Sequence, residues 1–215
     1  MRQKCIIVDD FYADPAAVLE YALGAEYLAF DGHTYPGENS VEPLLLPGIL
    51  ASFKKILGDH IEPSVEGMFG NFRVSMGGDA FEQDVHVDPS NTPGEHVWAG
   101  VLYLNPPAQC KRADGSTRDG TNFWRHKRLD IEQVPRTPAE GAALGFDSYE
   151  AVREQLIEED GNDRSKWELQ YRVPMKNNRM VFFRPTDWHS HGENFGRVRT
   201  DSRLVQIFFF RSGRG

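Results

Sequence analysis

The pattern near the start of the chain predicts a short strand and then a helix. Asp14 followed by Pro15 is typical of a helix start, because aspartate caps free backbone N–H groups and proline fits the first turn. We therefore expect a helix over Ala16–Leu23, preceded by a short strand at Lys4–Val8.

A run of apolar residues at helical spacing covers Leu46–Leu57, ends at Gly58 and predicts a second helix. We expect Pro47 in the first turn of this helix, where its missing N–H costs nothing. The segment Phe30–Ser40 between the two helices is rich in turn residues and predicts a long loop, placed to act as a lid.

After residue 65 the pattern changes to short segments of aromatic and β-branched residues, which favour sheets. The expected strands are Phe69–Met76, His96–Leu104, Thr121–His126, Arg179–Arg184 and Arg203–Arg211. A more polar insertion at about 128–178 leans towards helix, with Ser148 capping a helix over Tyr149–Glu159. Helices first and many strands afterwards predict an α+β fold whose core is a barrel or double-sheet jelly roll.

Composition limits the class of protein. The chain has 215 residues, of which 40% are hydrophobic and 26% charged, which is typical of a globular protein. We expect one domain over 1–215, with helices and loops in 1–64 supporting a β core in 65–211. No apolar run approaches the roughly 20 residues that span a bilayer, and the first ten residues lack the apolar core of a secretory signal.

The formal net charge of −8 argues against a general nucleic-acid binder, which needs a basic face to displace counterions. Two cysteines, Cys5 and Cys110, are too few for a disulfide framework or a thiolate metal site. We therefore expect a reducing, cytoplasmic setting and no membrane partner.

The first candidate for chemistry is His86-Val87-Asp88. In an extended segment, residues two apart point to the same face, so an imidazole nitrogen and a carboxylate oxygen can converge. These are two of the three ligands of a 2-His-1-carboxylate iron site. Such a pair also occurs by chance in chains of this composition, so it needs support from elsewhere in the sequence.

That support lies near the C-terminus, where the strand ending at Arg184 runs into a turn that carries His189 and His191. Arg203 then opens an apolar strand. Burying an arginine is costly without a partner, and a guanidinium matches a carboxylate in bidentate geometry. The alternative is an arginine at the exposed end of the strand, paired with an acidic neighbour.

The ordered combination resembles the Fe(II)/2-oxoglutarate-dependent oxygenases, and most of all their small prolyl-hydroxylase-like bacterial or phage members. It covers 65–211, with His-x-Asp, a distal histidine about 100 residues later and then a basic residue. Three further segments are similar to strands of that family: Ala99–Asn105, Gly120–His126 and Asn178–Phe183.

The resemblance implies a double-stranded β-helix (a jelly-roll, cupin-like core) with N-terminal helices packed on it and iron at one mouth. It implies that His86, Asp88 and a distal histidine bind Fe(II), with His189 preferred over His191. The cosubstrate 2-oxoglutarate would chelate the iron and pair through its far carboxylate with Arg203 (or Arg199), while Tyr103 donates a hydrogen bond.

The implied reaction is hydroxylation by O2, with release of succinate and CO2. The substrate, a small molecule or a side chain, is not identified by the sequence, and a nucleotide or nucleic acid is possible but not favoured. Two alternatives remain: a cupin-type metal enzyme that does not use 2-oxoglutarate, and a non-catalytic jelly-roll binding module. An inward Arg203 would distinguish the oxygenase from both alternatives, since neither alternative needs to bind a dicarboxylic acid. His126, next to Lys127, is expected at the surface rather than at a metal.

Overall fold

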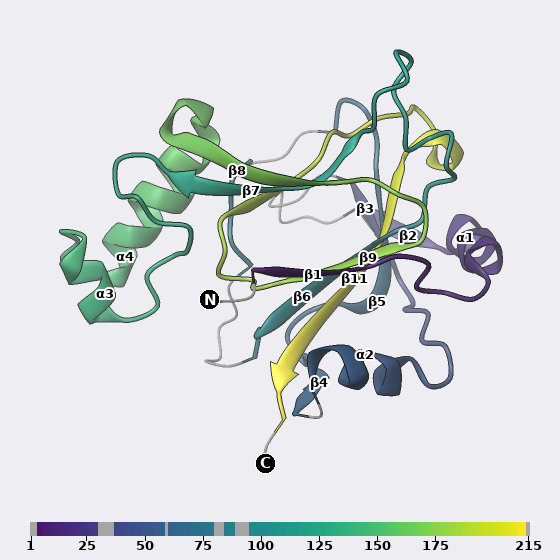
Figure 1. The fold of residues 1–215 in the computed structure, drawn as a ribbon, viewed down its shortest axis with the longest axis horizontal. Coiled ribbons are helices and arrows are strands. Elements are labelled where there is room, and N and C mark those ends of the chain that lie inside the picture. Colours follow the sequence, from purple (N-terminus) through teal and green to yellow (C-terminus); the bar gives the residue numbers. More distant parts are fainter. Residues whose placement is uncertain (1–3, 30–36, 59, 80–83, 89–94, 214–215) are drawn as a thin grey trace.

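The computed structural model describes residues 4–29, 37–58, 60–79, 84–88 and 95–213 of the chain. The regular structure of the described chain is mostly antiparallel β-sheet, and two sheets lie one over the other (Figure 1). One cluster of apolar side chains fills the space between the two sheets. A second cluster fills the space between the larger sheet and the N-terminal helices.

The larger sheet has the order β1-β9-β6-β11-β5-β3-β2, with β4 paired to β11. Its strands are β1 (Cys5–Val8), β2 (Tyr27–Ala29), β3 (Glu38–Ser40), β4 (Ile61–Pro63), β5 (Phe69–Ser75), β6 (Trp98–Tyr103), β9 (Arg179–Phe183) and β11 (Arg203–Ser212). The smaller sheet has the order β10-β7-β8. Its strands are β7 (Asp119–His126), β8 (Trp167–Pro174) and β10 (His189–His191). All the strands that the sequence predicts are present, with ends that differ by a few residues.

The long strand β11 explains how the two layers are built. Its side chains alternate in direction, as in any strand. Leu204 and Phe208 pack towards the N-terminal helices, whereas Val205 and Ile207 pack into the space between the sheets. Arg203 shares the direction of Val205 and therefore faces inwards.

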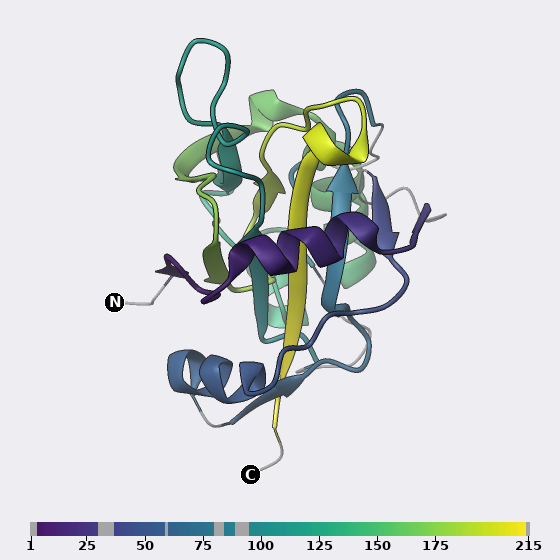
Figure 2. The same ribbon diagram turned by 90° about the vertical axis from the view of Figure 1, so that its right-hand side faces the viewer.

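Two N-terminal helices, α1 (Pro15–Gly24) and α2 (Ile49–Leu57), pack on the outer face of the larger sheet (Figure 2). The start of α1 agrees with the sequence: Asp14 accepts a hydrogen bond from the Ala17 N–H at 3.0 Å, and proline occupies the first turn. Phe53 of α2 is fully buried among aromatic rings of the sheet.

The start of α2 corrects the sequence prediction. The helix begins at Ile49 rather than Leu46, and Pro47 precedes it. Gly48 adopts a positive φ of 79° directly before the first turn, which interrupts the helical run. Gly58 ends the helix as expected, also with a positive φ.

The polar insertion holds short helical pieces, α3 (Pro138–Ala143), α4 (Tyr149–Val152), the π-helical η1 (Arg153–Glu159), and the 3-10 turns η2 (Asp160–Asn162) and η3 (Arg164–Lys166). Ser148 caps α4, as predicted, by accepting from the Ala151 N–H at 3.1 Å. The predicted single α-helix widens into a π-helix after Val152. The strand β8, which follows η3, was not predicted, although its apolar residues alternate with polar ones as in a half-buried strand, because the whole insertion was expected to lean towards helix.

The expected lid over Phe30–Ser40 lies largely outside the described residues, since only its end from Gly37 is described, including β3. One further 3-10 turn, η4 (Arg199–Asp201), precedes β11. None of the helices in the described part of the chain combines the length and the hydrophobicity that crossing a bilayer requires.

Candidate metal centre

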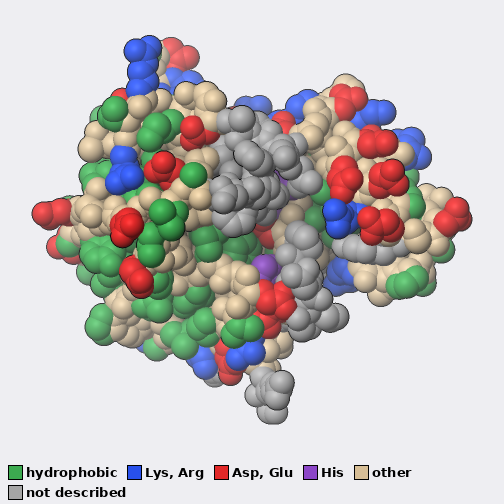
Figure 3. Space-filling model, turned by 180° about the vertical axis from the view of Figure 1, so that it is seen from behind, with side chains coloured by type: hydrophobic (Ala, Val, Ile, Leu, Met, Phe, Trp, Pro, Cys, Tyr) green, Lys and Arg blue, Asp and Glu red, His purple; other side chains and the backbone are tan. Residues whose placement is uncertain are grey.

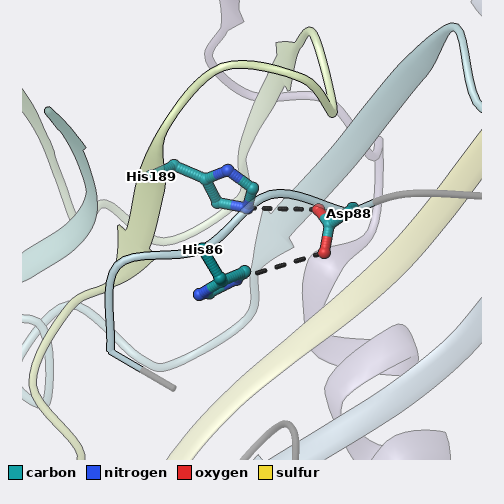
Figure 4. Close-up of side chains that lie close together, drawn as sticks. All are labelled: His86, Asp88 and His189. Carbon is teal, nitrogen blue, oxygen red and sulfur yellow. Dashed lines mark ion pairs between the residues drawn. The ribbon is translucent and has the colours of Figure 1, made fainter. Parts of the chain in front are cut away.

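The structure brings His86, Asp88 and His189 together, although a hundred residues separate the first and the last (Figure 4). The backbones of His86 and His189 form a two-way antiparallel bridge, with N–H to carbonyl distances of 2.8 and 3.0 Å. A third bond of 2.8 Å joins the Asp88 N–H to the Pro185 carbonyl. The segment that carries His-x-Asp is therefore held in extended form against β10, which turns both side chains to one side.

The three side chains are buried, with exposed fractions of 3%, 7% and 4% in chain order. One potential ligand atom from each lies within 4.8 Å of the other two. His189 Nε2 is 3.1 Å from Asp88 Oδ2, and His86 Nε2 is 4.0 Å from Asp88 Oδ1. Two imidazoles and one carboxylate in this arrangement are a donor set suited to Fe(II) with further positions left open.

Each imidazole is oriented by its other nitrogen. His86 Nδ1 lies 3.0 Å from the Asp84 carbonyl, and His189 Nδ1 lies 2.8 Å from the Asp187 carbonyl. Because a carbonyl can only accept, Nδ1 carries the hydrogen in both rings. In the neutral form, both Nε2 atoms then present lone pairs towards Asp88, which is how metal-binding histidines are commonly fixed.

Burial and charge act differently on the two rings. Burial, together with the neighbouring His189, lowers the pKa of His86 to about 3, so this ring is neutral. Burial also acts to lower the pKa of His189, but the charge and hydrogen bond of Asp88 outweigh it and raise that pKa. The 3.1 Å contact between His189 Nε2 and Asp88 Oδ2 thus favours a proton on this ring, and a metal ion that binds Nε2 would take the place of that proton.

The three residues open into a cavity of about 80 Å³ between the two sheets. On the face shown in Figure 3, histidine atoms are visible in a hollow between two larger masses of side chains. Much of the lining is apolar, from Met68, Ala99, Val101, Phe183, Val205, Ile207 and Phe209. Its polar members besides the three are Arg73, Ser75, Thr121, His191 and Arg203.

Arg203 is 4% exposed, yet its guanidinium makes few contacts. Its Nη2 donates to the Gly120 carbonyl at 3.0 Å, and within the described residues its Nη1 has no hydrogen-bond partner. Burial lowers the pKa of Arg203, and the groups that act against this are Tyr103 and Cys110 rather than a carboxylate. A buried cation left in this state calls for an anionic ligand from outside the chain.

Tyr103 lies beside this arginine, with Arg203 Cζ 5.6 Å from the centre of its ring. The side chain is fully buried, and burial raises the pKa of its hydroxyl to about 12, so the hydroxyl stays protonated. It forms a 2.7 Å hydrogen bond with Thr121 Oγ1. Of these two residues, Thr121 lines the cavity and Tyr103 does not, and no motif in the sequence points to Thr121.

The two alternatives raised by the sequence fall in different places. His191 lines the cavity, but it lies outside the group of three, and its Nδ1 is 2.5 Å from the Gly192 carbonyl. Arg199 lies elsewhere: its guanidinium is 3.4 Å from Glu38 and stands over the ring of Tyr27. The cavity is thus lined by Arg203 and not by Arg199.

The expectation for His126 was wrong. This histidine is fully buried rather than exposed, and its Nε2 lies 2.9 Å from the carboxylate of Asp160. The charged neighbour Lys127 misled the prediction, because on a strand adjacent side chains point to opposite faces.

Residues 1–204 match the model of a protein family described as "Family of unknown function (DUF6445)". No curated protein matches the sequence.

Solved structures with a similar fold include a prolyl-4-hydroxylase from Pseudomonas putida, with a TM-score of 0.50 and 15% identity over 99% of this chain and 94% of that chain. The non-heme alpha ketoglutarate dependent carbocyclase SnoK from nogalamycin biosynthesis has a TM-score of 0.50 and 12% identity, covering 98% of this chain and 80% of that one. EctD from S. alaskensis, with 2-oxoglutarate and 5-hydroxyectoine, has a TM-score of 0.46 and 14% identity, over 98% and 73%. At such identities the first two show a shared fold.

Proposed function

The chain belongs to the DUF6445 family of unknown function, and we propose that it is a non-haem Fe(II)- and 2-oxoglutarate-dependent dioxygenase. The proposed reaction is hydroxylation of a small molecule or side chain with O2, releasing succinate and CO2. The proposed core is a double-stranded β-helix. One observation carries the proposal: a buried His-Asp-His group and a buried arginine with an unfilled donor line the same cavity.

In this proposal His86, Asp88 and His189 hold the iron through Nε2, one carboxylate oxygen and Nε2. Bound iron and 2-oxoglutarate supply the oxidative chemistry, which activates O2 and attacks a C–H bond. The role of the three side chains is to fix the ion at one end of the cavity. Their anchored Nδ1 atoms keep the rings from turning away.

The cosubstrate fits the remaining donors. We assign the far carboxylate of 2-oxoglutarate to Arg203, whose Nη1 is the atom that lacks a partner in the described part of the chain. The Thr121 hydroxyl, which lines the cavity and is hydrogen-bonded to the protonated Tyr103 hydroxyl behind it, supplies a neutral donor. The apolar walls from β6, β9 and β11 exclude water from a reactive centre.

The same arginine weighs against the two alternatives. A cupin-type metal enzyme without 2-oxoglutarate, or a jelly-roll binding module, gains nothing from a buried guanidinium in the metal cavity and bears its desolvation cost. The free thiols of Cys5 and Cys110 agree with the proposed cytoplasmic setting. The acidic chain does not favour a nucleic-acid substrate.

Anaerobic addition of Fe(II) and 2-oxoglutarate tests the proposal. We expect a visible metal-to-ligand charge-transfer band with the wild-type protein, no band with His86→Ala, and a weaker band at equal 2-oxoglutarate with Arg203→Gln. Arg136→Gln is a matched control, because Arg136 is exposed and lies in the polar insertion. Absence of the band in the wild-type protein, or equal bands in all four proteins, would contradict the proposal.

A further inference from the structure

A further cavity adjoins the metal cavity. It is an open groove of about 500 Å³, and His191 belongs to the lining of both. His191 is the last residue of β10, the strand that also carries the metal ligand His189. A molecule that fills the groove therefore reaches the residue that borders the metal cavity.

The groove lies on the outer face of the smaller sheet. Along β7, Thr121 lines the metal cavity, whereas Asn122 lines the groove. Because successive side chains of a strand point to opposite faces, Asn122 is turned away from the larger sheet. Its partner across the strands is Ser190, which lies between His189 and His191 in β10. Asn122 is thus placed directly behind the strand that holds the metal ligand.

The charged side chains around the groove are largely paired with one another. The ion pairs are Asp84 with Arg164, Asp119 with Arg172, and Glu193 with Arg112 and Arg118. A fourth acid of the lining, Asp79, accepts a hydrogen bond from the Met76 N–H at 2.6 Å. The groove therefore offers a ligand little charge that the chain has not already compensated, which favours an uncharged group over an ion.

The side chain of Asn122 is buried in the wall of this groove without a hydrogen bond to its carbonyl. The residue is 7% exposed, and within the described part of the chain its Oδ1 has no hydrogen-bond partner. Its neighbours across the strands are engaged elsewhere: Ser190 accepts from the Trp124 indole N–H at 3.0 Å, and Arg172 lies 3.7 Å from Asp119. A buried acceptor without a donor is costly, so this carboxamide calls for a donor from outside the chain.

A second carboxamide in the same lining is in the same state. Asn194, in the loop that follows β10, also has a buried Oδ1 for which the described residues supply no donor. A carboxamide offers one acceptor and two donors, and rotation about its Cβ–Cγ bond decides which of them faces the groove. An amide of a ligand complements both functions at once, because its N–H donates to Oδ1 while its carbonyl accepts from Nδ2. An ammonium group can only donate, and a carboxylate can only accept.

We propose that this groove recognises the substrate, and that the substrate carries an uncharged amide which pairs with Asn122. The part to be oxidised extends past His191 into the metal cavity. A primary carboxamide and a peptide-like secondary amide share this chemistry. The proposal rests on the proposed function, because that function is what makes a ligand beside the metal cavity a substrate.

The test uses the full chain loaded with 2-oxoglutarate and Zn(II), a diamagnetic ion that the same ligands accept. Binding of propanamide is measured from its NMR signals and compared with propanoate, propylammonium and propan-1-ol, which have the same length. We expect propanamide to bind at least about 10-fold more tightly than each of these, since none of them replaces both hydrogen bonds of the amide. N-methylpropanamide shows whether a peptide-like amide is accepted as well.

A second measurement places the probe relative to the metal. With Mn(II) in place of Zn(II), and unbound metal removed, the unpaired electrons should broaden the methyl signal of propanamide in the wild-type protein. The same treatment of Asp88→Ala, which lacks a metal ligand, should leave that signal sharp. The charge-transfer band with Fe(II) is recorded on the wild-type protein in parallel, so that the proposed function is tested separately.

Variants then locate the contact. Asn122→Leu keeps the size of the side chain and removes the carboxamide, so propanamide binding should weaken about 10-fold. The unfolding temperature of the ligand-free variant should be unchanged or higher, because an unpaired buried polar group is lost. Asn177→Leu is the matched control: its carboxamide donates to the carbonyls of Leu104 and Asn105, so stability should fall and propanamide binding should not change. Asn194→Leu should weaken binding by a smaller factor, and it keeps the test decisive if Asn122→Leu does not fold.

Four results would overturn the proposal and leave the proposed function intact. They are a normal band without propanamide binding, equally tight binding of the alcohol or of a charged counterpart, unchanged binding in Asn122→Leu, and a propanamide signal that Mn(II) does not broaden. If the wild-type protein gives no band with Fe(II) and 2-oxoglutarate, the proposed function fails, and the role of the amide as part of a substrate fails with it.

Discussion

Two buried groups in this molecule combine histidine with aspartate, and they differ in what their second nitrogen does. At the metal centre, the Nδ1 atoms of His86 and His189 are anchored on backbone carbonyls, and both Nε2 atoms face Asp88 and the cavity. In the other group, both nitrogens of His126 are engaged: Nε2 contacts Asp160 at 2.9 Å, and Nδ1 accepts from the Leu129 N–H at 3.3 Å.

The surroundings of the second group are closed as well. The ring of His126 packs edge-on against Trp167, whose indole N–H donates to the Asp160 carbonyl at 2.7 Å. Neither His126 nor Asp160 lines the metal cavity. The comparison shows that a buried His-Asp pair is a candidate ligand set when one nitrogen is left facing a cavity, and a structural tie when both are satisfied by the protein.

The largest effect is expected from Asp88→Ala. Removing a charged ligand should cost more than the 10- to 100-fold loss typical of outer-shell changes, so metal affinity should fall by about 1000-fold or more. Thermal unfolding with and without Fe(II) or Co(II) measures this, because a metal that binds the native state raises the unfolding temperature of the wild-type protein only. If the metal still raises the unfolding temperature of Asp88→Ala, the metal does not bind at His86, Asp88 and His189.

The opposite result is expected from His126→Ala. It leaves the buried Asp160 carboxylate without its main partner, so the free energy of unfolding should fall by about 3 kcal/mol. Metal affinity should stay within about twofold of wild type, because this side chain holds the insertion to β7 and not the metal. Urea unfolding and metal titration of the same variant check both halves. A variant that loses metal affinity as severely as Asp88→Ala would show that the two groups are coupled.

Arg203→Met tests whether Arg203 serves ligand binding, like the metal centre, or stability, like His126. Methionine keeps the apolar stem and removes a buried charge whose desolvation few contacts offset, so the ligand-free protein should gain about 1 kcal/mol in unfolding free energy. Affinity for 2-oxoglutarate should fall about 100-fold. The band titration and urea unfolding measure these. A large loss of stability without ligand would instead assign Arg203 a structural role like that of His126.

The sequence predicts the first group better than the second for a physical reason. His86 and Asp88 share a face because their spacing matches the period of a strand, and Arg203 faces inwards because it is in phase with Val205. Such local rules also predict β5, β6, β7, β9 and β11. By contrast, His126 meets Asp160 only because the insertion folds back on β7, which no local spacing encodes.

The same limit explains the other elements that were missed. The three-residue strands β2, β3, β4 and β10 are defined by their pairing partners and carry too few residues to show a period. Arg73 was missed because an arginine on a strand is usually at the surface. Its inward direction becomes apparent only when Phe72 and Val74 are seen to pack under the helices.

The smallest effect is expected from Trp167→Phe, and it separates two contributions within the structural group. Phenylalanine keeps an aromatic ring near His126 but loses the indole N–H that donates to the Asp160 carbonyl. Because that buried carbonyl is then left with one acceptor site unfilled, the unfolding free energy should fall by about 1 kcal/mol, plus a small packing loss from the smaller ring.

Tyr171→Phe is a suitable control, since it also removes one polar group from an aromatic side chain of the same strand. If Trp167→Phe lowers the free energy of unfolding as much as His126→Ala does, the stability of this group depends on the indole rather than on the His126–Asp160 pair. Equal metal affinity in Trp167→Phe and wild type is expected, because this variant leaves the ring anchors of His86 and His189 in place.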